Sequence, residues 1–131
     1  MYTYSFEKLE VWNEAKEFTK CIYVLTSKFP DAEKFGLVSQ LRRASFSICS
    51  NIAEGSARNS YKDKAHYTTM AFGSAIEVLN QLILSFELNI IIENDYLKLR
   101  QDLESITNKL NGLRNYQINK SSEKSNNQIN K

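Results

Sequence analysis

The sequence predicts an all-α protein, an antiparallel up-down-up-down four-helix bundle, and three observations carry this prediction. Apolar residues recur every three or four positions through four long segments, which is the spacing of one helix face. Three short breaks separate these segments, and short connections between long helices make neighbouring helices antiparallel. One proline and four glycines in 131 residues leave too few turns for an all-β sandwich or barrel.

The first predicted helix has an apolar face that runs from Phe6 to Leu25. It ends before Pro30, because proline disfavours helical geometry in the residue that precedes it. We expect Asp31 to cap the second helix, which runs from there to about Arg58. The core positions of the second helix are spaced three or four residues apart: Leu37, Leu41, Ala44, Ile48 and Ile52.

The break at Asn59 and Ser60 offers the next cap, and the third helix is predicted from Tyr61 to about Leu88. Its expected core residues are Ala65, Thr68, Phe72, Ala75, Leu79, Leu82, Ile83 and Phe86. Asn94 is the expected cap of the fourth helix, whose apolar residues follow a seven-residue repeat. That repeat comprises Tyr96, Leu99, Leu103, Ile106, Leu110 and Leu113.

These segments predict one bundle domain over residues 1–118. Residues 119–131 read NKSSEKSNNQINK, which is polar and contains one large apolar residue. Such a segment cannot bury enough apolar surface to offset the entropy lost on ordering, so we expect a disordered C-terminal tail.

Composition excludes several classes of function. One histidine, His66, and two cysteines, Cys21 and Cys49, leave no set of metal ligands and no disulfide framework, so we expect neither metal nor cofactor. The sequence lacks glycine-rich phosphate-binding motifs, and a di-iron bundle needs paired Glu-x-x-His motifs. We therefore expect no enzyme and no catalytic residues. The remaining enzymatic alternative is an acid/base pair formed by Glu54 and Glu77.

Several sequence features favour a cytoplasmic protein. The N-terminal residues do not follow the pattern of a signal peptide. No run of about 20 uninterrupted apolar residues occurs, so we expect no membrane-spanning helix and no membrane partner. Two cysteines without an evident pairing fit a reducing compartment.

The two middle helices are unusually poor in charge. Residues 44–57 contain one charged side chain, Glu54, and residues 65–86 contain one, Glu77. On a helical wheel, small and apolar residues face away from the core, where a monomeric bundle would carry charges. Large apolar residues outside a bundle need a partner surface, although such helices are sometimes merely less polar than usual. We expect a homo-oligomer interface that includes Phe46, Cys49, Ala53, Met70, Gly73 and Leu84.

Polar, mostly uncharged residues lie beside this face. We expect them to form a hydrogen-bonded network that includes Gln40, Asn51, Glu54 and Glu77.

Basic residues also cluster along the middle of the chain, although the net charge of the whole protein is only +2. Between Lys34 and Lys64, six basic residues outnumber two acidic ones, a local excess of +4. Repeated around an oligomer, this excess would attract phosphate groups. The candidate nucleic-acid contacts are Arg42, Arg43, Arg58, Lys62 and Lys64. The alternative is that these are solubilising charges, with Arg43 or Arg58 paired to Glu54 or Glu77, and no aromatic platform for single-stranded nucleic acid is expected beside them.

Three runs of residues carry a family resemblance: FEKLEVWNEAKEF, IYVLTSKFPDAEKFGLVSQLRRASFSICSNIAEGSARNS and FGSAIEVLNQL. The most specific positions are Gln40, Arg42, Arg43, Ala44, Ser47, Ile48, Asn51, Ile52, Ala53, Glu54, Gly55 and Arg58, followed by Gly73, Ser74 and Glu77. Over residues 6–115 the chain resembles the four-helix bundle proteins found in intervening sequences of 23S ribosomal RNA genes.

This resemblance implies a homopentamer of four-helix bundles around a central channel. The family is also similar to the accessory protein of diversity-generating retroelements, a basic pentameric barrel that binds nucleic acid and partners a reverse transcriptase. We therefore expect a non-enzymatic pentamer that binds structured RNA, or an RNA-protein complex, through repeated basic surfaces. The alternative is a protein-protein scaffold or accessory subunit that docks a partner enzyme, such as a reverse transcriptase, without touching nucleic acid.

Overall fold

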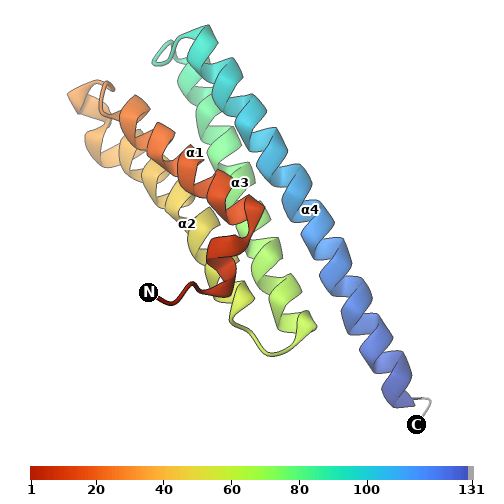
Figure 1. The fold of residues 1–131 in the computed structure, drawn as a ribbon. Helices are drawn as coiled ribbons and strands as arrows, with labels where there is room; N and C mark the ends of the chain where they lie inside the picture. Colours follow the sequence, from red (N-terminus) through yellow and green to blue (C-terminus); the bar gives the residue numbers. More distant parts are fainter. Residues whose placement is uncertain (130–131) are drawn as a thin grey trace.

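The structure is a computed structural model that describes residues 1–129, and the side chains of residues 1–123. It contains four α-helices: α1 (Glu10–Thr26), α2 (Ser39–Ser56), α3 (Tyr61–Glu87) and α4 (Glu93–Ile129). No strand occurs among residues 1–129, and the predicted all-α, four-helix fold class is confirmed. Figure 1 shows that each helix runs back alongside the helix that precedes it.

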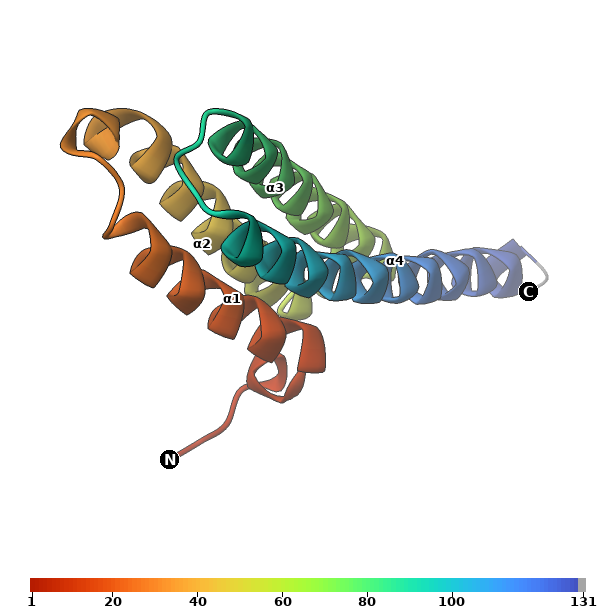
Figure 2. The ribbon, with the colours of Figure 1, turned by 90° about the horizontal axis from the view of Figure 1, so that it is seen from above.

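The four helices surround one apolar core. Each helix neighbours two others, and α1 and α3 lie diagonally across the bundle (Figure 2). Fully burying a leucine or isoleucine side chain stabilises the fold by roughly 1.5–3 kcal/mol. The largest fully buried aliphatic side chains come from every helix: Ile22, Leu41, Ile48, Val78, Leu82, Leu103, Ile106 and Leu110. The predicted spacing of apolar residues therefore identifies most of the core. On α3, however, the fully buried residues include Ala71 and Val78, which are not among the predicted ones, whereas four residues predicted for the core pack at its margin, as Leu37 of the α1–α2 connection does: Phe72, Leu79, Ile83 and Phe86.

The turn between α1 and α2 differs from the prediction. Pro30 opens a short 3-10 turn over Asp31–Glu33, and the π-helical segment Lys34–Val38 follows it. The backbone nitrogen of Glu33 donates to the carbonyl of Pro30 at 2.9 Å, which closes this turn. Asp31 therefore lies inside the turn rather than at a helix cap, and α2 begins later, at Ser39.

The other two connections are built by local polar chemistry. Ser60 caps α3 as predicted, because its hydroxyl accepts a hydrogen bond from the backbone nitrogen of Asp63 at 3.1 Å. After α3, Asn89 adopts a left-handed conformation with φ of 60°, which asparagine tolerates better than most residues. The chain then turns directly into α4, which begins at Glu93 rather than after an Asn94 cap.

The C-terminal segment, for which the sequence predicts a disordered tail, continues α4 as far as Ile129. Residues 130–131 lie outside the described part. No glycine or proline follows Gly112 to interrupt the helix. The ammonium group of Lys120 also lies over the ring of Tyr116, 5.7 Å from its centre, one turn away along the helix. Figure 1 shows this part of α4 projecting past the end of α3.

The helices are not packed equally tightly. The pairs α2–α3 and α3–α4 share the most extensive contacts, and α1–α4 share the fewest. A groove of about 730 Å³ follows the α1–α4 seam and reaches Phe18 and Ile106. The bundle is therefore closed along α2–α3 and partly open along α1–α4.

By length and composition alone, α3 is the one helix in the described part that could cross a membrane. In this fold, α3 packs between α2 and α4. It buries Ala71, Ala75, Val78 and Leu82 in the bundle core. A long apolar helix whose side chains are buried in this way is also typical of the core of a helix bundle.

Candidate functional site

The first candidate surface is the outward face of α2 and α3. Phe46 on α2 is 54% exposed, and Met70 and Leu84 on α3 are 44% and 48% exposed. Gly73 is also exposed and has open space where a side chain would be. Cys49 and Ala53 are half-buried. The structure therefore places four of the six predicted interface residues in the open and two at the edge of the core.

Two further apolar residues extend this surface. Ile76 is 44% exposed and Leu88 is 66% exposed, and both lie on α3 or directly after it. We use the term uncharged face for Phe46, Ala53, Met70, Gly73, Ile76, Leu84 and Leu88 together. Half-exposed side chains of this size on one surface are the pattern that a partner surface covers.

Phe46 and Cys49 also border a groove between α1 and α2. The ring of Phe46 meets that of Tyr23 edge to face, with their centres 5.8 Å apart. The groove has a volume of about 480 Å³, and Trp12 and Lys16 line its other end. Burial raises the pKa of the Cys49 thiol above its ordinary value, and the neighbouring Thr19 hydroxyl only partly opposes this.

Along the contact between α2 and α3, polar side chains form hydrogen bonds in two separate parts. In the first part, the guanidinium of Arg43 pairs with the carboxylate of Glu77. The side-chain amide of Gln81 donates to Glu77 at 3.5 Å and to the amide oxygen of Gln40 at 3.4 Å. The amide oxygen of Gln81 is buried and has no hydrogen-bond partner among the described residues.

The second part of the network lies further along the same two helices. The hydroxyl of Ser74 donates to that of Ser47 at 2.9 Å, and the side-chain amide of Asn51 donates to the carbonyl of Ser47 at 2.9 Å. Together the two parts fix the register of α2 against α3.

The structure does not bring Glu54 and Glu77 together as an acid/base pair. Glu77 lies across from Arg43, and Glu54 is eleven residues further along α2, which is about 16 Å of helix. The side chain of Glu54 is exposed and makes no hydrogen bond within the described part of the chain. Of the four predicted members of the polar network, Glu54 is the one that lies outside it.

The predicted basic residues do not form one patch, because the fold separates them. Arg42 lies fourteen residues before the end of α2, about 21 Å along its axis, and faces α1. Its guanidinium stacks on the ring of Tyr23 at 4.3 Å and donates to the Thr26 hydroxyl at 2.9 Å. Arg43 faces α3 and Glu77, as described above. Arg42 and Arg43 therefore hold neighbouring helices in the described structure.

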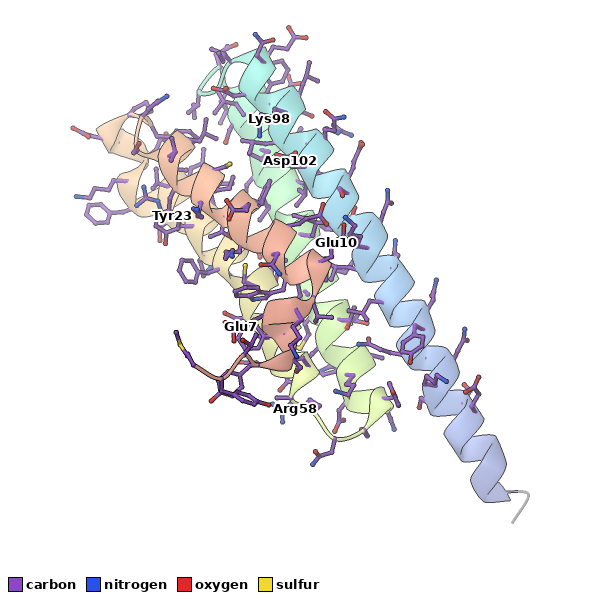
Figure 3. The ribbon with its side chains drawn as sticks, viewed as in Figure 1. Glu7, Glu10, Tyr23, Arg58, Lys98 and Asp102 are labelled. Carbon is purple, nitrogen blue, oxygen red and sulfur yellow. The ribbon has the colours of Figure 1, made fainter. Side chains whose placement is uncertain are left out.

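The other three basic residues lie together at the turn between α2 and α3. Arg58 stacks over the ring of Tyr67, 4.5 Å from its centre, and donates to the Tyr67 hydroxyl at 2.5 Å. The ammonium group of Lys64 donates to the carbonyl of Ser56 at 2.9 Å, and Lys62 is exposed. We call Arg58, Lys62 and Lys64 the basic end of the bundle. Figure 3 shows Arg58 at this end.

Sequence reasoning missed an ionic cluster that joins α1 to α4. The ammonium group of Lys109 donates to Glu14 at 2.5 Å and to Glu10 at 3.0 Å, and Ser105 donates to Glu14 at 2.8 Å. Burial raises the pKa of Glu14, the hydrogen bonds from Lys109 and Ser105 lower it, and the net effect is a pKa below the ordinary value. The same contacts raise the pKa of Lys109. Glu14 and Glu10 lie 95 and 99 positions before Lys109 in the sequence, so residue spacing gave no signal for this cluster.

Metal-ligating side chains do not gather within the described part. No three histidine, cysteine, aspartate or glutamate side chains there lie close enough to hold a metal ion. His66 is exposed on α3, and its ring lies edge to face with that of Tyr67.

Comparison with known proteins identifies the family. A family-level profile described as 23S rRNA-intervening sequence protein matches residues 7–112, which is most of the chain. The chain belongs to this family. Within the 23S rRNA-intervening sequence protein family, the matched range contains the whole uncharged face and the basic end, together with the polar network.

A solved structure supports the fold of this family member. The crystal structure of a protein of unknown function from the S23 ribosomal protein family of Bacteroides thetaiotaomicron is similar, with a TM-score of 0.73. The two sequences are 22% identical, and the alignment covers 79% of this chain and 97% of the other. No functionally curated protein matches the chain. The family and its solved relative are therefore of unknown function, and the similarity to the solved structure concerns the fold.

Proposed function

We propose that this protein is a non-enzymatic subunit that assembles with copies of itself through the uncharged face and binds structured RNA through the basic end. The observation that carries the proposal is the uncharged face, because it leaves Phe46 on α2, and Met70 and Leu84 on α3, about half exposed. From the family resemblance, we take a homopentamer as the assembled form.

Self-association is favoured by the character of this surface. Burying apolar area contributes about 25 cal/mol per Å², whereas charged residues at the centre of an interface must be desolvated. The one charge between Lys64 and Glu87 on α3 is Glu77, which Arg43 of the same subunit already neutralises. On α3 this face therefore carries no unpaired charge, whereas on α2 the exposed Glu54 beside Ala53 would have to stay at the rim of the interface.

RNA binding would follow from repetition of the basic end. In one subunit, Arg58, Lys62 and Lys64 contribute three positive charges, and the neighbouring Asp63 removes one. Such a small excess binds phosphate weakly, but several copies on one assembly raise the overall avidity by orders of magnitude. The stacked guanidinium of Arg58 is held in position by Tyr67, which reduces the entropy lost when it contacts a phosphate.

A protein scaffold is the second candidate function, and the α1–α4 groove favours it. This groove of about 730 Å³ has an apolar floor at Phe18 and Ile106, with Glu10 and Glu17 on its rim. Arg42 and Arg43, in addition, are engaged with neighbouring helices and are less available for phosphate. In this alternative, the assembly docks a partner protein or enzyme and makes no contact with nucleic acid.

The assembly is tested by native mass spectrometry and by light scattering of purified protein. We expect wild type to be a pentamer and Leu84→Glu to be a smaller species with unchanged helical circular dichroism. The matched control is Leu97→Glu on α4, where the wild-type side chain is 55% exposed but lies outside the uncharged face. A monomeric wild type, or equal mass for all three proteins, contradicts assembly through this face.

The RNA part is tested by titrating a structured RNA fragment at increasing salt. Electrostatic binding predicts that the logarithm of affinity falls linearly with the logarithm of salt concentration. Lys62→Glu should weaken binding. Lys28→Glu should change it little, because Lys28 lies just after α1, at the other end of the bundle from Lys62. A pentamer that binds no RNA at low salt would favour the protein scaffold instead.

A further inference from the structure

The N-terminal residues form a short row of aromatic side chains. The ring of Tyr2 meets that of Tyr4 edge to face at 5.0 Å, and the ring of Tyr4 lies nearly parallel to that of Phe6 at 6.4 Å. Phe6 in turn meets Trp12 of α1 at 5.0 Å. The first two rings face solvent, since Tyr2 is 76% exposed and Tyr4 is 60% exposed. We call these four residues the aromatic row.

Hydrogen bonds fix the segment that carries this row. The carboxylate of Glu7 accepts a hydrogen bond from the backbone nitrogen of Tyr4 at 2.7 Å, and the backbone nitrogen of Glu7 donates to the carbonyl of Tyr4 at 3.1 Å. The side-chain amide of Asn13 on α1 donates to the carbonyls of Glu7 and Leu9, both at 2.9 Å. The rings are therefore presented by a short 3-10 turn, Ser5–Lys8, that is anchored to the first helix.

The fold places this segment at the basic end of the bundle. Ser5 lines a pocket of about 240 Å³ together with Gly55 and Ser56 of α2 and Lys64 of α3. The Lys64 ammonium donates to Ser56 at the same place. Figure 3 shows Glu7 and Arg58 at this end of the molecule. Ser5, in the turn that carries the rings, thus lies beside Ser56 and Lys64, which are more than fifty positions away in sequence.

We propose that the aromatic row and the basic end together bind an unpaired stretch of RNA. The bases stack on the exposed rings of Tyr2 and Tyr4, and the phosphates contact Arg58 and Lys62. Every base has a π-face, so stacking of this kind is tolerant of sequence and requires that the bases be unpaired. The inference rests on the proposed function and specifies it, since it says which form of RNA the basic end selects.

Duplex RNA would use only half of this surface. Its bases are stacked inside the helix, so phosphate contacts with the basic end remain and the tyrosines contribute little. The site should therefore prefer single-stranded over double-stranded RNA of equal length.

The test compares a single-stranded RNA of about 12 nucleotides that carries the fluorescent base 2-aminopurine with a duplex of equal length. We expect wild type to quench the fluorescence on binding and to bind the single strand more tightly. The double variant Tyr2→Ala and Tyr4→Ala should bind the single strand about tenfold more weakly, with little change for the duplex. The conservative variant Tyr2→Phe and Tyr4→Phe should retain both affinity and quenching, because stacking needs the ring and not the hydroxyl.

Phe35 provides the matched control. Its ring is 90% exposed beside Lys34, at the opposite end of α2, so it is an aromatic residue next to a cation but away from the basic end. Phe35→Ala should leave both affinities unchanged, and circular dichroism checks that every variant is folded.

Two outcomes overturn the inference, and they have different consequences for the proposed function. If wild type binds both RNAs and the double alanine variant binds the single strand as tightly as wild type, RNA binding stands and the aromatic row is not its site. If wild type binds neither RNA at low salt, the inference and the RNA part of the proposed function fail together.

Discussion

Gly55 of α2 and Tyr67 of α3 lie so close together that a Cβ atom on Gly55 would come within 2.8 Å of the Cβ of Tyr67. Because the Cβ of Tyr67 is fixed to the backbone, only a shift of α2 or α3 would relieve such a contact. Tyr67 in turn supports the guanidinium of Arg58, 4.5 Å above its ring. One contact therefore sets both the spacing of the two helices and the position of a cation at the basic end.

Gly55→Ala should destabilise the protein. Alanine is a better helix former than glycine by about 1 kcal/mol, but overpacking a closely packed contact costs about 1–3 kcal/mol. Gly112→Ala on α4 is the matched control, since a Cβ there meets nothing within 4 Å and should stabilise the helix. Urea unfolding measures both changes. Equal stability of the two variants would show that α2 and α3 separate without cost.

The pair formed by Arg43 and Glu77 should show a small favourable coupling. Their side chains are 61% and 37% exposed, and exposed ion pairs contribute about 0.2–1 kcal/mol. Arg43→Glu would place two carboxylates side by side and should destabilise the protein, and adding Glu77→Arg should recover part of the loss. A double-mutant cycle of unfolding free energies measures the coupling. Additive effects of the two changes would mean that the pair contributes nothing in solution.

The Glu14 carboxylate should make stability depend on acid pH. Its pKa in the folded protein lies below the ordinary value of 4.5. A carboxyl group with a lowered pKa stabilises the folded state above its unfolded pKa, and this contribution is lost as the pH falls through the folded value. We expect Glu14→Gln to be less stable than wild type by about 0.5–1 kcal/mol at neutral pH, and this difference should shrink as the pH falls below the ordinary value of 4.5.

Urea unfolding at several pH values measures this difference. Glu104→Gln is the control, because the Glu104 side chain is exposed and makes no hydrogen bond within the described residues. The difference in unfolding free energy between this variant and wild type should stay constant through the acid range. The raised pKa of Lys109 acts at alkaline pH. Its contribution to stability is present below the pKa of the unfolded state and is lost only as the pH rises above 10.5.

Deleting residues 119–131 should leave the bundle intact. Among the side chains that the structure describes, residues 1–123, the last one of α4 that is buried against another helix is Gln117, whose amide oxygen accepts a hydrogen bond from Thr68 at 2.7 Å. Beyond it, Lys120 contacts Tyr116 and Glu123, which both belong to α4 itself. The midpoint of thermal unfolding should therefore change little. A large loss of stability would place the domain boundary further along α4 than residue 118.

The periodicity of apolar residues predicts the fold class, the number of helices and most of the core. The reason is that burial of Leu41, Ile48, Leu82 and Leu110 is the dominant local pattern, and it repeats with the helical period. Ser60 was predictable as a cap because its hydroxyl bonds to a backbone nitrogen only three residues away, which is also a local pattern.

Other features depend on contacts that spacing does not encode. The basic residues are close in sequence, but their positions around the helix axis direct Arg42 toward α1 and Arg43 toward α3. The reverse holds for the N-terminal turn, because Ser5 lies far from Lys64 in sequence but lines the same pocket at the basic end. For residues 119–129 the sequence predicts disorder from their low apolar content, whereas helix propensity and contacts within α4 also extend a helix.

The uneven packing of the four helices has a consequence for local unfolding. Amide hydrogens exchange with solvent through partial opening, and the helix that packs least extensively against its neighbours opens first. In this bundle that helix is α1, which shares its smallest contact with α4 and borders the 730 Å³ groove. Deuterium should therefore enter α1 before α2 and α3. Opening of α1 would also carry Tyr2 and Tyr4 away from the basic end, so the occupancy of that end and the exchange rate of the first helix should be thermodynamically linked.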